Sequence, residues 1–169
     1  PGAARLNGLL AVALGRSGGD PSEIKAAIAA ALKLDPACKE ALLADGELLQ
    51  RLGKPAEAEA RFQELIQKGG DGFDVRQRLG DSLSARELYD KAQAEYTRAK
   101  ALDPDRSEPY ERLAKNFTKQ KREAEALKEL TAAAHLDIMD ARLAADLVER
   151  LHGQKQWAQV IELGELALH

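Results

Sequence analysis

Apolar and polar residues are arranged along the chain with the period of an α-helix. Apolar side chains recur at i, i+3, i+4 and i+7 in successive bursts, which is the spacing that gives a helix one apolar face. Proline begins two of the bursts, as Pro21 and Pro55, where the first helical turn needs no backbone donor. The pattern predicts helices over residues 3–16, 21–34, 38–52, 55–68, 73–86, 88–102, 107–120, 123–136, 140–153 and 156–168.

The bursts form a longer repeat of 34 residues. Ala58, Ala92 and Ala126 are spaced by 34, and so are Gly46 and Gly80. A period of this length is typical of helix pairs joined by a tight turn. One such pair buries too little apolar surface to offset the entropy of ordering it, so each pair must pack on the next. The turns inside the pairs are expected at Gly53-Lys54-Pro55, Glu87-Leu88-Tyr89, Lys121-Arg122-Glu123 and Lys155-Gln156-Trp157.

The repeat resembles the tetratricopeptide repeat (TPR) family. Residues 73–106 match its pattern best, with Leu79, Gly80, Leu83, Ala92, Tyr96, Ala99 and Pro104 at positions 7, 8, 11, 20, 24, 27 and 32. The resemblance implies an all-α fold, a right-handed superhelical solenoid of about five helix-turn-helix units, with the first helix of each unit (the A helix) on the concave face. The chain would be a single TPR domain over 1–169, with repeats at 5–38, 39–72, 73–106, 107–140 and 141–169.

Asp45 departs from this pattern, because position 7 of a TPR is usually apolar. A carboxylate at a helix seam is costly unless it is paired or partly exposed. We therefore expect Asp45 to have a local partner, such as an Arg of an adjoining helix, or to reach solvent.

Composition limits the classes of partner. The chain has 25 Lys and Arg against 28 Asp and Glu, a net charge of −3, which argues against broad electrostatic binding to nucleic acid. No stretch is long and apolar enough to suggest membrane insertion. One cysteine excludes an intrachain disulfide and is compatible with the cytoplasm or the periplasm. Because the chain opens at Pro1 without an initiator Met, we expect it to be a fragment of a longer protein.

No residue pattern predicts a catalytic centre. His135, His152 and His169 belong to no HExxH motif or close ligand cluster, so we expect no metal site. The glycine-rich segment 69–72 lacks the Lys-Ser or Lys-Thr of a phosphate-binding loop and is interpreted as a turn between repeats. We therefore expect neither a cofactor nor enzymatic activity.

The TPR resemblance implies a protein or peptide ligand in the concave groove, contacted by positions 2, 5, 9, 12 and 13 of the A helices. Acidic residues recur there, and a concave wall would focus their field on a basic segment. Alternatively, they are solvated helix faces offset by pairs such as Glu111 with Lys115. One TPR subfamily clamps the C-terminal carboxylate of chaperones with Lys and Asn at two of these positions. This chain has Gln77 and Asp81 there, so the resemblance does not predict that clamp. The candidate binding residues are Glu40, Glu47, Arg51, Asp74, Gln77, Asp81, Glu108, Glu111, Lys115, Lys119, Arg142 and Glu149.

The sequence favours a protein-binding scaffold and leaves two other functions open. The domain could recruit substrates for a larger enzyme. It could instead assemble with copies of itself through its last helix, where Val160, Ile161 and Leu163 have no evident covering helix. A homo-oligomer formed through that helix is therefore a second possible assembly beside a protein or peptide partner.

Overall fold

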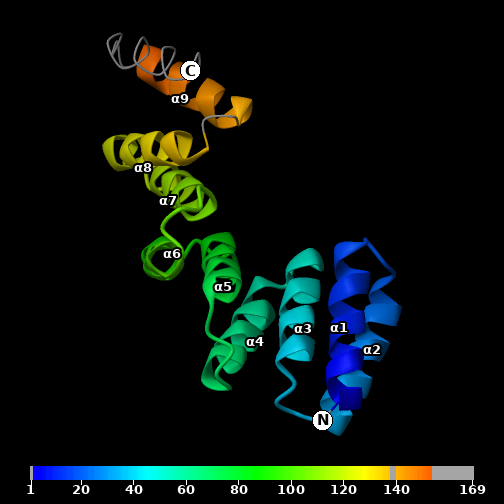
Figure 1. Ribbon diagram of the computed structural model, residues 1–169. Helices are drawn as coiled ribbons and strands as arrows, with labels where there is room; N and C mark the ends of the chain where they lie inside the picture. The colour runs from blue at the N-terminus through cyan, green and yellow to red at the C-terminus, as the bar shows by residue number, and fades with distance from the viewer. Residues whose placement is uncertain (1, 138–139, 154–169) are drawn as a thin grey trace. The chain divides into compact units, whose positions relative to one another are not determined.

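The computed structural model describes residues 2–137 and 140–153, and this part of the chain consists of nine α-helices and their connections (Figure 1). The helices are α1 (Gly2–Arg16), α2 (Pro21–Leu34), α3 (Lys39–Arg51), α4 (Pro55–Gln67), α5 (Phe73–Ala85), α6 (Tyr89–Leu102), α7 (Glu108–Lys119), α8 (Glu123–Leu136) and α9 (Ala141–Gly153). Each lies within one residue, at both ends, of the range predicted from the periodicity. The expected helix over 156–168, with Trp157, His169 and the apolar surface considered for self-assembly, lies outside the described residues.

The chain divides into two compact units, Pro1–Glu95 and Tyr96–His169. In the first unit α1 packs on α2 and α3 packs on α4. Helix α3 also contacts α1 and α2, and α5 contacts α4 and α3. In the second unit α7 pairs with α8, and α9 packs on α8. Within each unit, therefore, a helix pair is followed by a helix that packs on it, as stacked helix-turn-helix repeats require. The single domain expected over 1–169 stays a prediction.

The repeat positions singled out by the sequence form the core. Ala58, Ala92 and Ala126, all at position 20, are completely buried. The large residues at position 24 are also buried: Phe62, Tyr96 and Leu130. Small side chains let two helices approach closely, and large side chains fill the remaining space. The 34-residue alignment therefore identifies the residues that hold the helix pairs together.

In the four helix pairs whose inner turn the structure describes, that turn places one residue in the left-handed region of φ. Gly18 and Gly53 have φ of 76° and 69°. The corresponding residues of the next two pairs are Glu87 and Lys121, with φ of 61° and 60°. A Cβ atom makes this conformation costly, so the turns at Glu87 and Lys121 carry local strain that Gly18 and Gly53 avoid.

Asp45 has the partner expected for it. Its Oδ2 atom lies 2.6 Å from Nε of Arg61 in α4, and Arg61 also reaches Glu64 through Nη1 at 2.9 Å. The Asp45 side chain keeps 18% of its surface exposed. The carboxylate at position 7 is therefore both paired and partly hydrated, which explains how the helix seam tolerates it.

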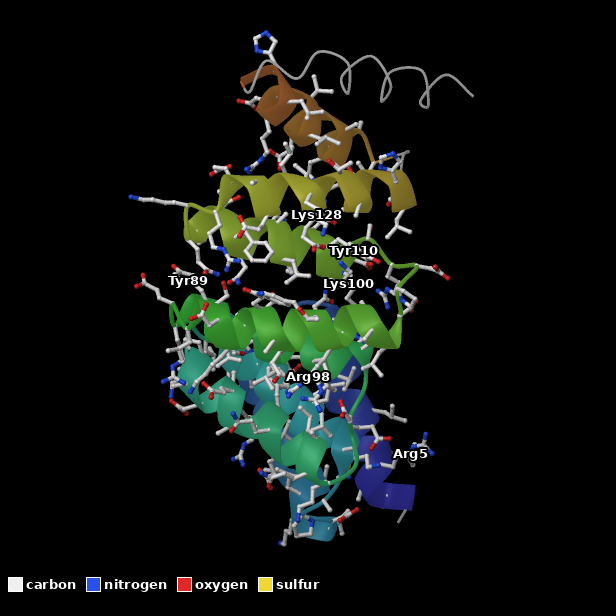
Figure 2. All side chains as sticks on the ribbon, turned by 90° about the vertical axis from the view of Figure 1, so that its left-hand side faces the viewer. Arg5, Tyr89, Arg98, Lys100, Tyr110 and Lys128 are labelled. Atoms are coloured by element: carbon white, nitrogen blue, oxygen red, sulfur yellow. The ribbon has the colours of Figure 1, made fainter. Side chains whose placement is uncertain are left out.

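In the second unit, Lys100 joins the end of α6 to α7 and α8. Its ammonium group lies 4.1 Å from the centroid of the Tyr110 ring and 2.8 Å from Glu129 Oε2. Lys100 and Tyr110 are labelled in Figure 2. Tyr110 Oη donates to the carbonyl oxygen of Pro104 at 2.9 Å. These contacts fix the connection that leads into α7, the helix that carries the candidate site.

Candidate functional site

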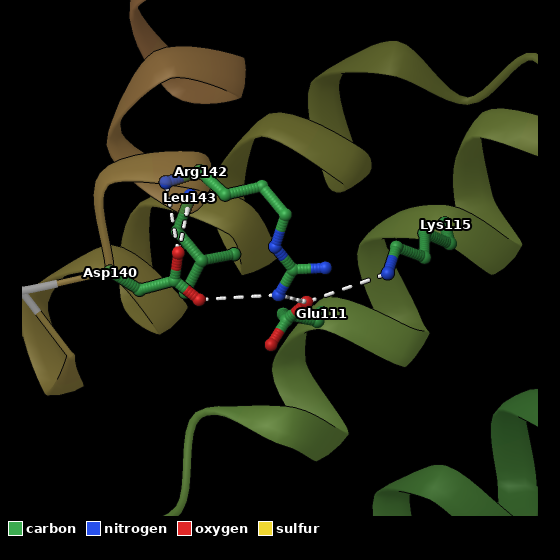
Figure 3. Close-up of polar contacts among 5 residues, drawn as sticks. All are labelled: Glu111, Lys115, Asp140, Arg142 and Leu143. Carbon is green, nitrogen blue, oxygen red and sulfur yellow. Dashed lines mark hydrogen bonds and ion pairs between the residues drawn. The ribbon is translucent and has the colours of Figure 1, made fainter.

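Three candidate residues of the second unit, Glu111, Lys115 and Arg142, meet where α7 faces α9. Glu111 in α7 is buried, and its Oε2 atom accepts from Arg142 Nη2 at 3.1 Å and from Lys115 Nζ at 3.4 Å (Figure 3). Arg142 comes from the first turn of α9. Glu111 thus joins α7 to the next A helix, α9, through Arg142, and its contact with Lys115 lies within α7. The structure therefore contains the Glu111–Lys115 pair that the sequence offered as one alternative.

Asp140 is a second carboxylate that contacts the Arg142 side chain. Its Oδ2 atom accepts from Arg142 Nη2 at 3.2 Å, and its Oδ1 atom accepts from the backbone N–H groups of Arg142 and Leu143. The carboxylate therefore caps α9 and also orients the arginine. The Arg142 side chain holds the pKa of Asp140 below its ordinary value, and Asp140 in turn raises the pKa of Arg142.

Glu111, Lys115 and Arg142 border a pocket of about 180 Å³, which we call the α7–α9 pocket. Its apolar part consists of Ala114, Leu130 and Leu143, which are all buried. Arg150 lies on another wall and is held by Asp146 at 2.8 Å and by Thr118 Oγ1 at 3.1 Å. The pocket is lined by Glu111, Ala114, Lys115, Leu130, Arg142, Leu143, Asp146 and Arg150.

A second depression lies where α7 and α9 begin, and we call it the acidic hollow. It has a volume of about 450 Å³, and five carboxylates line it against two guanidinium groups. Arg106 contacts Glu108 with two nitrogen atoms, at 2.7 and 3.2 Å, and lowers the pKa of Glu108. The lining residues are Asp105, Arg106, Ser107, Glu108, Glu111, Leu136, Asp137, Asp140 and Arg142.

The first unit has its own pocket on the A helices, of about 220 Å³, between α1 and α3. Glu47 Oε1 lies there 2.8 Å from Nη2 of Arg78. Arg51 donates to the carbonyl oxygens of Gly15 in α1 and of Gly19 in the turn after α1, at 3.1 and 3.4 Å. Both predicted residues, Glu47 and Arg51, are thus engaged in holding neighbouring A helices together.

The structure brings only part of the predicted set into pockets. Glu47 and Arg51 line the pocket of the first unit, while Glu108, Glu111, Lys115 and Arg142 line the two depressions of the second. The other predicted residues border none of these three, although Glu40 forms an ion pair with Arg5 at 3.0 Å. That remaining group is Glu40, Asp74, Gln77, Asp81, Lys119 and Glu149.

Sequence reasoning missed Asp140, Asp146 and Arg150. A signal for Asp146 and Arg150 was present, because they are spaced i, i+4. A second signal was the spacing of 31 residues that separates Glu47 from Arg78 and Glu111 from Arg142. In a 34-residue repeat this spacing is one helical turn short of the period, so it places opposite charges side by side on successive A helices.

The described residues contain no group of three or more His, Cys, Asp and Glu side chains that could hold a metal ion. Within the same residues, every helix is too short or too polar to cross a membrane.

No protein-family model matches the chain, and no curated protein matches it. Among solved structures, it is similar to PilF of Pseudomonas aeruginosa, with a TM-score of 0.84 and 19% identity over 98% of this chain and 75% of that one. MamA of Desulfovibrio magneticus RS-1 gives 0.79 and 17% over 98% and 93% of the two chains. YrrB, described as a TPR protein with an unusual peptide-binding site, gives 0.70 and 20% over 94% and 81%. The chain has the fold of the tetratricopeptide repeat proteins.

Proposed function

We propose that the chain is a non-catalytic scaffold that binds a partner protein or peptide on the faces of its A helices. The fold supports this proposal, since stacked helix pairs present such faces for recognition. The peptide-binding site named for YrrB, a protein of the same fold, points in the same direction. The single observation that carries the proposal is the pair of adjoining depressions on α7 and α9.

The partner's binding segment is basic. The acidic hollow supports this choice, because five carboxylates line it against two arginines. A concave wall of one sign concentrates counter-charges and increases the rate at which a charged ligand arrives. Asp105 and Asp137 are exposed at its rim, where a ligand can reach them without breaking the Glu111–Arg142 pair.

The test is to reverse the charge of the rim. Asp105→Lys with Asp137→Lys is compared with Glu23→Lys with Asp90→Lys, which makes the same change in net charge at exposed sites on α2 and α6. Binding of a fluorescent peptide of lysine, glycine and serine is measured by anisotropy at low and at physiological salt. We expect the rim variant to weaken binding about tenfold or more and the control variant to change it less than about twofold.

Equal losses in the two variants would mean that only overall charge matters, and the acidic hollow would then not be the binding site. Unchanged affinity in both variants would lead to the same conclusion. An acidic peptide of the same length serves as the ligand control and should not bind the wild-type chain.

A further inference from the structure

The α7–α9 pocket differs in chemistry from the acidic hollow beside it. Its inner wall consists of the buried apolar residues Ala114, Leu130 and Leu143. The charged groups at its edge already have partners inside the protein: Arg150 is held by Asp146, Glu123 and Thr118, and Arg142 is held by Glu111 and Asp140. A ligand that entered with a charged group would compete with these contacts. An apolar side chain would instead cover the apolar wall and leave the ion pairs intact.

The two depressions share one boundary. Glu111 and Arg142 line both of them, so the ion pair between these residues stands where the pocket meets the hollow (Figure 3). A peptide segment that lies across this pair places one side chain in each depression. In an extended segment, alternate side chains point to the same face, so the two side chains would come from positions i and i+2.

We infer that the partner segment carries an apolar residue two positions from a basic one, with the apolar side chain in the α7–α9 pocket and the basic side chain in the acidic hollow. This inference rests on the proposed function and adds an apolar anchor to it. The anchor provides affinity through burial of apolar surface, and the basic residue fixes the direction and register of the segment.

The inference is tested by selecting ligands from a library of random displayed peptides on the full 169-residue chain. We expect the recovered peptides to share Lys or Arg two positions from Leu, Ile, Met or Phe. A synthetic peptide of this sequence is then compared with one in which the apolar residue is Ser. We expect the Ser peptide to bind about 10- to 100-fold more weakly, because a buried aliphatic side chain is lost.

A variant of the protein tests whether the apolar side chain of the peptide binds in the α7–α9 pocket. Ala114→Met fills the space beside Leu130 and Leu143, and Ala145→Met on the exposed side of α9 is its matched control. On the Ala114→Met chain the apolar and the Ser peptide should bind equally, whereas on the control the difference should persist. Circular dichroism and thermal unfolding check that both variants fold, and the comparison between peptides on the wild-type chain does not depend on either variant.

The outcomes separate the two proposals. Recovered peptides that are basic but need no apolar residue would overturn the anchor and leave the basic scaffold standing. Selection of apolar peptides without a basic residue, or recovery of no peptide, would overturn both. A peptide difference that survives unchanged in a folded Ala114→Met chain would also overturn the anchor.

Discussion

Gly46 in α3 leaves the space that the ring of Phe62 in α4 occupies. A Cβ atom placed on Gly46 would lie 2.5 Å from Cε1 and 2.7 Å from Cζ of Phe62. Phe62 is completely buried and cannot move aside without disturbing its neighbours. We therefore expect Gly46→Ala to lower the free energy of unfolding by about 1–3 kcal/mol, although alanine is the better helix former.

Gly15 in α1 is the matched control, because nothing lies within 4 Å of a Cβ atom built there. Gly15→Ala should cause no loss in a urea titration of unfolding. If the crowding is specific, adding Phe62→Leu to Gly46→Ala should cost less than the sum of the two single changes. A fully additive double variant would contradict the proposed contact between Gly46 and Phe62.

The same pair shows why the fold could be predicted from the sequence. Gly46 and Phe62 occupy positions 8 and 24, and a small residue at position 8 with a large one at position 24 recurs in the repeats that begin at residues 39, 73 and 107. Periodicity of this kind is a local signal that survives without any knowledge of tertiary contacts. Asp45 was a visible exception to the pattern, and a partner such as an Arg of an adjoining helix could be anticipated because a carboxylate at a helix seam needs one; the structure identifies that partner as Arg61.

The candidate site was less predictable, because it depends on the rotation of each A helix relative to the next A helix. The positions of Glu111 and Arg142 in the repeat predicted that both face the groove, but they did not reveal that the two side chains form an ion pair. The apolar wall was hidden for the same reason. Leu130 belongs to α8 and Leu143 to α9, and only the packing of these helices brings them to one pocket.

The backbone of Lys121 is strained, because its Cβ atom disfavours a conformation that glycine adopts freely. Its φ of 60° lies in the left-handed region, at the place where the first two helix pairs have Gly18 and Gly53. Lys121→Gly should therefore raise the free energy of unfolding by up to about 1 kcal/mol, reduced by the greater freedom of glycine in the unfolded chain. Thermal unfolding measures the change.

Lys121→Ala separates backbone strain from the loss of a charge. Alanine keeps the Cβ atom, so it should give no comparable gain. A gain of the same size in both variants would show that the lysine charge, and not the backbone, sets the stability of this turn.

Arg76 in α5 bridges two carboxylates within the first unit. Its guanidinium contacts both oxygens of Asp71 at 2.6 Å and Glu95 Oε2 at 2.7 Å, and hydrogen bonds to Asp71 help to raise its pKa. The side chains of Arg76 and Glu95 are only 14% and 11% exposed. Arg76→Met should cost about 3 kcal/mol of unfolding free energy, because it leaves the Glu95 charge buried without its guanidinium.

Two further variants test this explanation. Arg76→Lys should recover little, since an ammonium group cannot contact both oxygens of Asp71 and Glu95 together. Arg76→Met with Glu95→Gln should be more stable than Arg76→Met alone, because the buried charge is gone. Urea titrations at neutral pH give these differences, and a double variant no more stable than Arg76→Met would contradict the role assigned to the charge.

Glu108 links stability to pH at the mouth of the acidic hollow. The two contacts with Arg106 hold the pKa of Glu108 below its ordinary value of 4.5. A carboxylate whose pKa is lower in the folded than in the unfolded chain binds fewer protons when folded. Its stabilisation is therefore fully present above the unfolded pKa and is lost as the pH falls through the folded one. Glu108→Gln should lower Tm at pH 7 and have a smaller effect at pH 3, because the stabilisation decreases as the pH falls below the unfolded value of 4.5. Glu149→Gln, on the exposed face of α9, is the matched removal of one carboxylate and controls for the change in net charge. A Tm difference for Glu108→Gln that is the same at both pH values would mean that Glu108 stabilises α7 through packing and not through its charge.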